Sequence, residues 1–183
     1  MKFLQNIREN IGFSMLCKHA AKLKRNKSFN NLDTAKTVGI LFDSAQQQNY
    51  ESAKHFMKTL SDNGIEVEAL GMVLNEEMLR YFPPTNNVSL FRLDKLTFFG
   101  YPDDERVKPF LSREFDILIN LCLDENLCID YVMGMSKAKF KVSMNLRSED
   151  FADFILQYSP ENRPTTDELI VKIQKYLSAL RKA

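Results

Sequence analysis

Apolar residues along this chain occur either in short continuous runs or at helical spacing. Residues 37–43 form a nearly continuous apolar run, which is typical of a strand covered on both faces. Residues 46–63 then change to helical spacing, and Gly64 stands where a glycine commonly ends a helix. Residues 65–74 resume the strand pattern. A strand, a helix and a second strand in succession predict a βαβ unit with parallel strands and a right-handed crossover.

The second half of the chain repeats these patterns. Residues 115–122 form another strand of the buried type, residues 140–145 form a further one, and residues 151–158 alternate loosely like an edge strand. A capping box, Thr165 to Glu168, predicts the start of the last helix. Together these elements predict a three-layer α/β fold, Rossmann-like or flavodoxin-like, with a mostly parallel sheet of about five strands flanked by helices.

The N-terminal segment has a different character. Its apolar residues recur at spacings that suit one face of a helix, and Gly12 interrupts the pattern. The stripe consists of Leu4, Ile7, Ile11, Met15, Leu16, Ala20 and Leu23. We expect residues 1–33 to form a basic amphipathic helix and its connection. Residues 34–183 are expected to form a single α/β domain, since a chain of 183 residues falls within the usual single-domain range.

Composition places the chain among globular proteins of a reducing compartment. Apolar residues make up 44% of the chain and charged residues 27%, which argues against intrinsic disorder. Three cysteines are too few, and odd in number, for a secreted disulfide framework. No apolar run is long enough to cross a bilayer, and residues 1–17 lack the apolar core of a signal peptide. We therefore expect a cytoplasmic protein.

Charge is distributed unevenly along the chain. The net charge is only +1, but residues 1–27 hold seven basic side chains and one acidic, whereas the remainder holds 18 basic and 23 acidic. Three interpretations of the basic segment stay open: contact with nucleic acid, peripheral contact with the anionic inner surface of a membrane, or docking on the domain. A fourth combines them, with the helix docked and its basic face still bound to an anionic partner such as a protein. The residues expected to contact an anionic partner are Lys18, Lys22, Lys24, Arg25 and Lys27.

Polar residues gather just after the predicted strands. In open α/β sheets, ligands bind beyond the carboxyl ends of the strands, where the strand order reverses. The residues at these ends, which would line such a pocket, are Asp43, Ser44, Asn120, Asp124, Asn126, Ser143 and Asn145. The alternative is that Asp43, Ser44 and Asn126 only cap helices and turns, a role that suits the same residue types.

No residue pattern indicates a particular chemistry. Residues 43–49 have neither the glycines nor the lysine of a phosphate-binding loop, which argues against a nucleotide site of the usual kind. Cys122 and Cys128 do not have the spacing of a zinc or redox pair. His19 and His55 have no cysteine or acid in register, so no nucleophilic arrangement can be assembled. We therefore predict no metal, no cofactor and no catalytic residue.

Three blocks carry a resemblance to a known family. They are residues 38–43 (VGILFD), 115–120 (FDILIN) and 136–142 (SKAKFKV), together with the basic N-terminus. They resemble a family of short, uncharacterised bacterial α/β proteins classed only as a domain of unknown function, which implies a compact α/β fold and no particular activity. The last two blocks also resemble, more weakly, the N-terminal Rossmann-like half of heptosyltransferase-type glycosyltransferases. The chain is too short for their second half, where the nucleotide sugar binds, so this likeness concerns the fold.

Two functional hypotheses follow from these features. The first is a non-catalytic binding protein whose cationic N-terminal helix contacts an anionic partner, as the charge distribution suggests. The second is a small-ligand-binding or enzymatic domain with its site at the carboxyl ends of the parallel strands. A concave pocket at those ends would favour the second hypothesis, whereas polar side chains used up as helix caps would weaken it.

Overall fold

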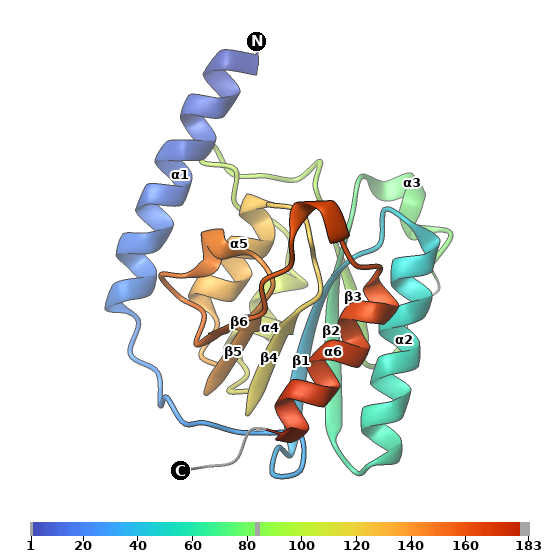
Figure 1. The fold of residues 1–183 in the computed structure, drawn as a ribbon. Helices are drawn as coiled ribbons and strands as arrows, with labels where there is room; N and C mark the ends of the chain where they lie inside the picture. Colours follow the sequence, from blue (N-terminus) through green and yellow to red (C-terminus); the bar gives the residue numbers. More distant parts are fainter. Residues whose placement is uncertain (1, 83–84, 180–183) are drawn as a thin grey trace.

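The computed structural model describes residues 2–82 and 85–179, and these form a sheet of six parallel strands (Figure 1). The strands are β1 (Thr37–Asp43), β2 (Glu66–Val73), β3 (Val88–Arg92), β4 (Ile117–Asn120), β5 (Phe140–Ser143) and β6 (Phe154–Ile155). Their order across the sheet is β3-β2-β1-β4-β5-β6, and every neighbouring pair is parallel. The predicted α/β fold is confirmed. The sheet has six strands where about five were expected, and the short β6 lies within residues 151–158, where an edge strand was expected, and pairs with β5.

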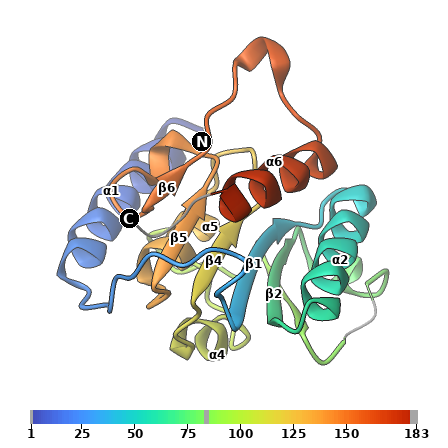
Figure 2. The same ribbon diagram turned by 60° about the horizontal axis from the view of Figure 1, so that its bottom comes forward.

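Helices cover both faces of this sheet (Figure 2). On one face lie α2 (Gln47–Asp62) and α6 (Thr166–Ala179), and on the other lie α1 (Lys2–Lys22), α4 (Val107–Ser112) and α5 (Leu127–Met135). Shorter elements are α3 (Glu76–Leu79) and the 3-10 turns η1 (Leu146–Ser148) and η2 (Pro160–Asn162). Among the described residues, no helix combines the length and the apolar character needed to cross a bilayer.

The central strand β1 accounts for the two apolar layers. Its residues 38–42 are all buried. Val38 and Ile40 belong to the core beneath α2 and α6, whereas Leu41 belongs to the core beneath α5. Because successive side chains of a strand point to opposite faces, a continuous apolar run is satisfied only when helices cover both faces.

Helix α1 docks on the domain through glycine contacts. Leu16 is buried, and a Cβ atom at Gly134 of α5 would lie 2.8 Å from its Cδ1 atom, so the two helices meet where one of them has no side chain. One turn of α1 before Leu16, the carbonyl oxygen of Gly12 accepts a hydrogen bond of 2.6 Å from the hydroxyl of Tyr101. A Cβ atom at Gly12 would collide with the carbonyl oxygen of Phe99. Gly12, which interrupts the apolar pattern, is therefore a point of close contact.

The predicted apolar stripe of this helix coincides only in part with its buried face. Ile7 and Ile11 are 41% and 49% exposed, and they lie on the half of α1 that projects beyond the sheet (Figure 1). The inward side includes Leu16 and the partly buried Ala20 from the predicted stripe, together with Gly12, which the pattern left out. The prediction was wrong for Ile7 and Ile11 because the contact depends on Gly12, and a glycine contributes nothing to a hydrophobic pattern although it allows close approach.

The connection from α1 to β1, residues 23–36, is fixed by Arg25. Its guanidinium donates hydrogen bonds to the carbonyl oxygens of Ala138 and Lys139, at 3.0 and 3.2 Å, and pairs with Asp153 at 2.5 Å. The Arg25 side chain is only 6% exposed. This residue, expected from the sequence to contact an anionic partner, therefore ties the connection to the amino ends of β5 and β6.

Candidate functional site

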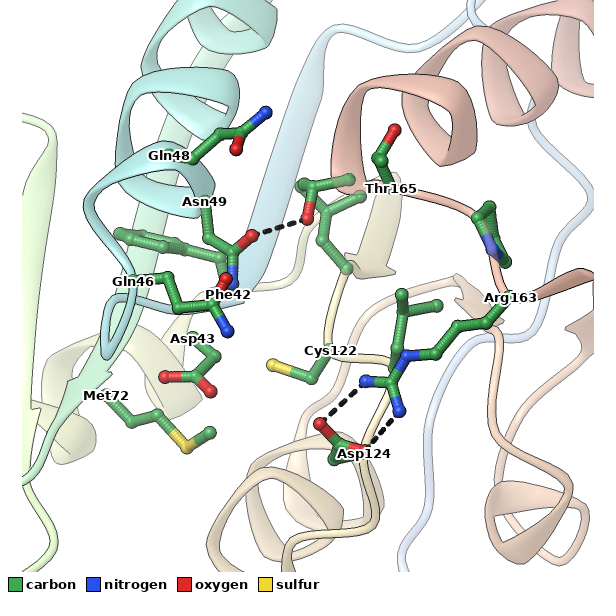
Figure 3. Close-up of a pocket in the computed structure, with 14 residues that line it drawn as sticks. Phe42, Asp43, Gln46, Gln48, Asn49, Met72, Cys122, Asp124, Arg163 and Thr165 are labelled. Atoms are coloured by element: carbon green, nitrogen blue, oxygen red, sulfur yellow. Dashed lines mark hydrogen bonds and ion pairs between the residues drawn. The ribbon is translucent and has the colours of Figure 1, made fainter. Parts of the chain in front are cut away.

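The strand order reverses between β1 and β4, which are neighbours in the sheet. The chain leaves β1 through α2 on one face and leaves β4 through α5 on the other, so the two connections diverge. A cavity of about 420 Å³ lies at this point, between the turn after β1, the loop after β4 and the segment that enters α6 (Figure 3). This is the position at which open α/β sheets bind ligands.

The lining of this cavity is largely polar. It comes from residues 42–49, 121–124 and 163–166, with Met72 at the end of β2. Besides two carboxylates, the polar side chains are Gln46, Gln48, Asn49, Arg163, Thr165 and Thr166. A few convergent polar groups in a concave site are typical of small-molecule binding sites.

Asp43 carries the least compensated charge of the cavity. Its Oδ1 atom accepts a hydrogen bond of 2.8 Å from the N–H of Ala45, and no cationic side chain in the described part of the chain forms an ion pair with it. Partial burial raises the pKa of this carboxyl above its usual value, and the charge of Asp124 adds to the effect. A ligand that brings a hydrogen-bond donor to Asp43 would relieve this cost.

Asp124 is held in a different way, by Arg163. The two nitrogens of the guanidinium donate to the two carboxylate oxygens at 2.8 and 2.7 Å (Figure 3). This pairing holds the pKa of Asp124 below its usual range. The side chains are 50% and 71% exposed, so the pair contributes at most about 1 kcal/mol to stability. Its geometric effect is to join the segment entering α6 to the loop after β4, along one side of the cavity.

The amino ends of α2 and α6 meet at the cavity. The hydroxyl of Thr166 donates a hydrogen bond of 2.7 Å to Oδ1 of Asn49. The predicted capping box of α6 is confirmed, since Thr165 Oγ1 accepts from the N–H of Glu168 at 3.3 Å and the Glu168 carboxylate accepts from the N–H of Thr165 at 2.8 Å. Gln46, at the cap position of α2, makes no such side-chain bond. Its amide group is therefore available to a ligand.

Cys122 contributes a buried thiol that points toward the cavity (Figure 3). Burial, together with the charges of Asp43, Asp130 and Asp124, raises its pKa well above the ordinary value. The nucleophilic form of cysteine is the thiolate, so this environment disfavours a nucleophilic role. Within residues 2–82 and 85–179, no group of three or more histidine, cysteine, aspartate or glutamate side chains is arranged to hold a metal ion.

The strand-end residues predicted from the sequence divide into two groups. Asp43 and Asp124 line the cavity. The other five are buried or half-buried and bind the main chain: Ser44, Asn120, Asn126, Ser143 and Asn145.

Each of these five has a structural partner. The hydroxyl of Ser44 donates to a carbonyl oxygen of β2 at 2.6 Å, and Asn120 Oδ1 accepts the N–H two residues further along at 2.9 Å. Asn126 caps α5 and Asn145 caps η1, while Ser143 Oγ accepts the N–H of Asn145 at 3.2 Å. These five side chains are therefore used within the fold, four of them on helix ends and turns and Ser44 between β1 and β2, and Asp43 likewise accepts one main-chain N–H while it lines the cavity.

Several cavity residues escaped the sequence analysis. Gln46, Gln48 and Asn49 follow β1 directly, and a polar run at the start of a crossover helix was an available signal. Arg163 lies in the long segment between β6 and α6, and no local pattern places it next to Asp124.

The basic residues of the N-terminal segment lie away from this cavity. Lys18, Lys22 and Lys24 are exposed and form no ion pair with the described residues. Lys27 is 71% exposed and lies 3.5 Å from Asp153. Four of the five predicted contact residues are therefore accessible.

Comparison with known proteins places the chain in a family. The model of the Family of unknown function (DUF6913) matches residues 8–180, which confirms the resemblance to such a family. No curated protein matches the chain. An exopolyphosphatase-related protein from Bacteroides fragilis is similar in structure, with a TM-score of 0.49 and 15% identity over 80% of this chain and 41% of that chain. This chain thus spans less than half of that protein, and the likeness carries no functional argument. The resemblance to heptosyltransferase-type enzymes stays a prediction.

Proposed function

Since the chain belongs to the Family of unknown function (DUF6913), we propose its function from the geometry of the cavity: it binds a small polar molecule at the carboxyl ends of β1 and β4. The observation that carries this proposal is a polar cavity, with an uncompensated Asp43, at the reversal of strand order. A volume of about 420 Å³ lies within the range of small-molecule sites, about 300–1,000 Å³.

The ligand that fits this lining carries hydroxyl groups or a protonated amine. Asp43 can only accept hydrogen bonds when ionised, and the amides of Gln46 and Gln48 can both donate and accept. The cation of the lining, Arg163, is already neutralised by Asp124. The charged lining therefore has a net negative charge, which disfavours a phosphorylated or otherwise strongly anionic ligand.

Binding fits the cavity better than catalysis does. Asp43, with its raised pKa, is the lining group that suits a general acid or base, and an enzymatic version of the proposal depends on it. The neighbouring Cys122 is disfavoured as a nucleophile by its raised pKa. His19 and His55 do not belong to the cavity lining.

A thermal-shift screen tests the proposal. The panel contains sugars, polyols, aliphatic amines, amino acids and phosphorylated compounds. We expect a neutral or cationic compound to raise the melting temperature, since a ligand at a hundred times its Kd stabilises the folded state by about 2.7 kcal/mol. Asp43→Asn and Gln48→Ala should abolish the shift, whereas the exposed Asp103→Asn should preserve it. A panel without hits, or hits to which all variants respond like the wild type, would overturn the proposal.

A second proposal concerns the basic segment, whose residues Lys18, Lys22, Lys24 and Lys27 contact an anionic partner. The observation that favours it is that α1 docks through its opposite side and Arg25 fixes the connection that follows. Lys18 and Lys22 of the helix and Lys24 and Lys27 of the connection therefore face solvent from a fixed surface. Retention on heparin tests it. Lys18→Gln with Lys22→Gln should elute at lower salt than Lys172→Gln with Lys175→Gln, which removes the same charge from α6. Equal elution of the two variants would contradict this role.

A further inference from the structure

The outward face of α1 presents apolar and basic side chains in a fixed order. Ile7 and Ile11 are 41% and 49% exposed, and the exposed Lys18 and Lys22 follow further along the helix. Successive spacings of four, seven and four residues bring all four to one side of a helix with 3.6 residues per turn. The opposite side carries Leu16, which is buried against α5.

The loop before α4 carries further exposed apolar side chains. Gly12 is in close contact with Phe99, so the loop before α4 runs directly beside the helix. The adjacent Phe98 is 75% exposed, and Leu96 is 39% exposed. On the helix itself, Ile7 and Ile11 stand one turn apart on the same side, and neighbouring exposed apolar side chains are more typical of an interaction site than single scattered ones.

The basic end carries charge that the protein itself does not neutralise. Lys18, Lys22 and Lys24 form no ion pair with any residue of the described chain, and Lys27 reaches an acidic group only at 3.5 Å. Residues 28–183 hold 18 basic and 23 acidic side chains, so the body carries the opposite net charge. An anionic surface is therefore attracted to this edge of the molecule and repelled by most of the remainder.

We infer that this face binds the anionic surface of a lipid bilayer, an inference that rests on the proposed role of the basic segment. Lipid phosphates would meet Lys18 and Lys22, while Ile7 and Ile11 would enter the headgroup region. A nucleic acid would match the lysines and leave the apolar side chains in water. A second copy paired through this face would set lysines against lysines in a parallel arrangement, or against isoleucines in an antiparallel one.

Vesicle co-sedimentation with the full chain tests this inference. The wild type should bind vesicles that contain phosphatidylglycerol, bind pure phosphatidylcholine far less, and bind less at high salt. Lys18→Gln with Lys22→Gln should weaken binding about 30-fold, which is the loss for two lysines at an anionic membrane. Ile7→Ser with Ile11→Ser should weaken it about tenfold or more. Val171→Ser, at a 64% exposed position of α6, is the matched apolar control and should bind like the wild type.

Heparin separates this inference from the role on which it rests. The lipid inference fails if the isoleucine variant binds phosphatidylglycerol vesicles as well as the wild type does. It also fails if the wild type binds heparin or RNA but no vesicles. In both cases the proposed role of the basic segment stands. If the wild type binds neither heparin nor vesicles, both fail. Because Ile7 and Ile11 are exposed, their variant should melt at the wild-type temperature, so that weaker binding reflects a lost contact and not unfolding.

Discussion

Lys141 of β5 is a buried lysine whose replacement should change how stability depends on pH. It is 1% exposed, and its ammonium donates hydrogen bonds to the carbonyl oxygens of Met133 and Gly134, at 2.6 and 3.2 Å, at the carboxyl end of α5. Burial, with a smaller contribution from the charge of Arg25, lowers its pKa from 10.5 to about 7. Lys141→Met removes the titrating group and nearly keeps the volume.

The direction and size of the effect follow from proton binding. The unfolded chain keeps the lysine proton up to about pH 10.5, whereas the folded chain releases it near pH 7. Between these values the unfolded state binds more protons, so the free energy of unfolding rises with pH. At about 1.4 kcal/mol per pH unit, the wild type gains about 2 kcal/mol between pH 7 and pH 9. Below pH 7 both states are protonated, and the cost of burying the ammonium is fully present.

Urea unfolding followed by circular dichroism, from about pH 6 to about pH 9.5, measures this gain. The wild type should gain stability relative to Lys141→Met across the alkaline half of the range. Lys137→Met, at an exposed lysine nearby, should follow the wild type. Parallel curves for the wild type and Lys141→Met would refute the reasoning, because they would show that Lys141 titrates alike in the folded and unfolded chains.

Three further predictions concern the α1 contact, a buried acid and the cavity. Gly12→Ala places a methyl group against the Phe99 carbonyl and should lower the free energy of unfolding, measured with urea, by about 1–3 kcal/mol. Ser14→Ala, at an exposed position of the same helix, should change it little. Burial raises the pKa of Asp130 to about 7, so the folded chain binds more protons than the unfolded chain between about pH 4 and pH 7. The free energy of unfolding, measured with urea across this range, should therefore fall as pH rises, and Asp130→Asn should lack this fall. Arg163→Gln should change the free energy of unfolding by less than about 1 kcal/mol, yet calorimetry should show weaker binding of a neutral ligand, because the segment entering α6 is no longer joined to the loop after β4.

The strands could be predicted because their signal is local. Residues 37–43 and 115–122 are continuous apolar runs, and such runs suit parallel strands between two helical layers. The docked face of α1 could not be predicted in this way. Its contact depends on Gly12 meeting Phe99 and on Gly134 meeting Leu16, and such contacts arise between segments far apart in the sequence.

The candidate site was predictable in position and only partly in composition. Asp43 and Asp124 follow β1 and β4, so the rule for open α/β sheets finds them. Asn120 and Asn126 stand in equivalent places but bind the main chain, and their residue type suits either role equally. Arg163 reaches the cavity through the path of the segment between β6 and α6, which no local pattern determines.

An NMR titration of the isotope-labelled protein, with the strongest compound from the thermal-shift screen, tests the central claim most directly. The account predicts that amide shifts cluster in residues 43–49, 121–124 and 163–166, and that Asp43→Asn weakens binding at least about tenfold, as expected when a charged hydrogen-bond partner is lost. Shifts that cluster elsewhere on the molecule, or an Asp43→Asn variant that binds as tightly as the wild type, would contradict it.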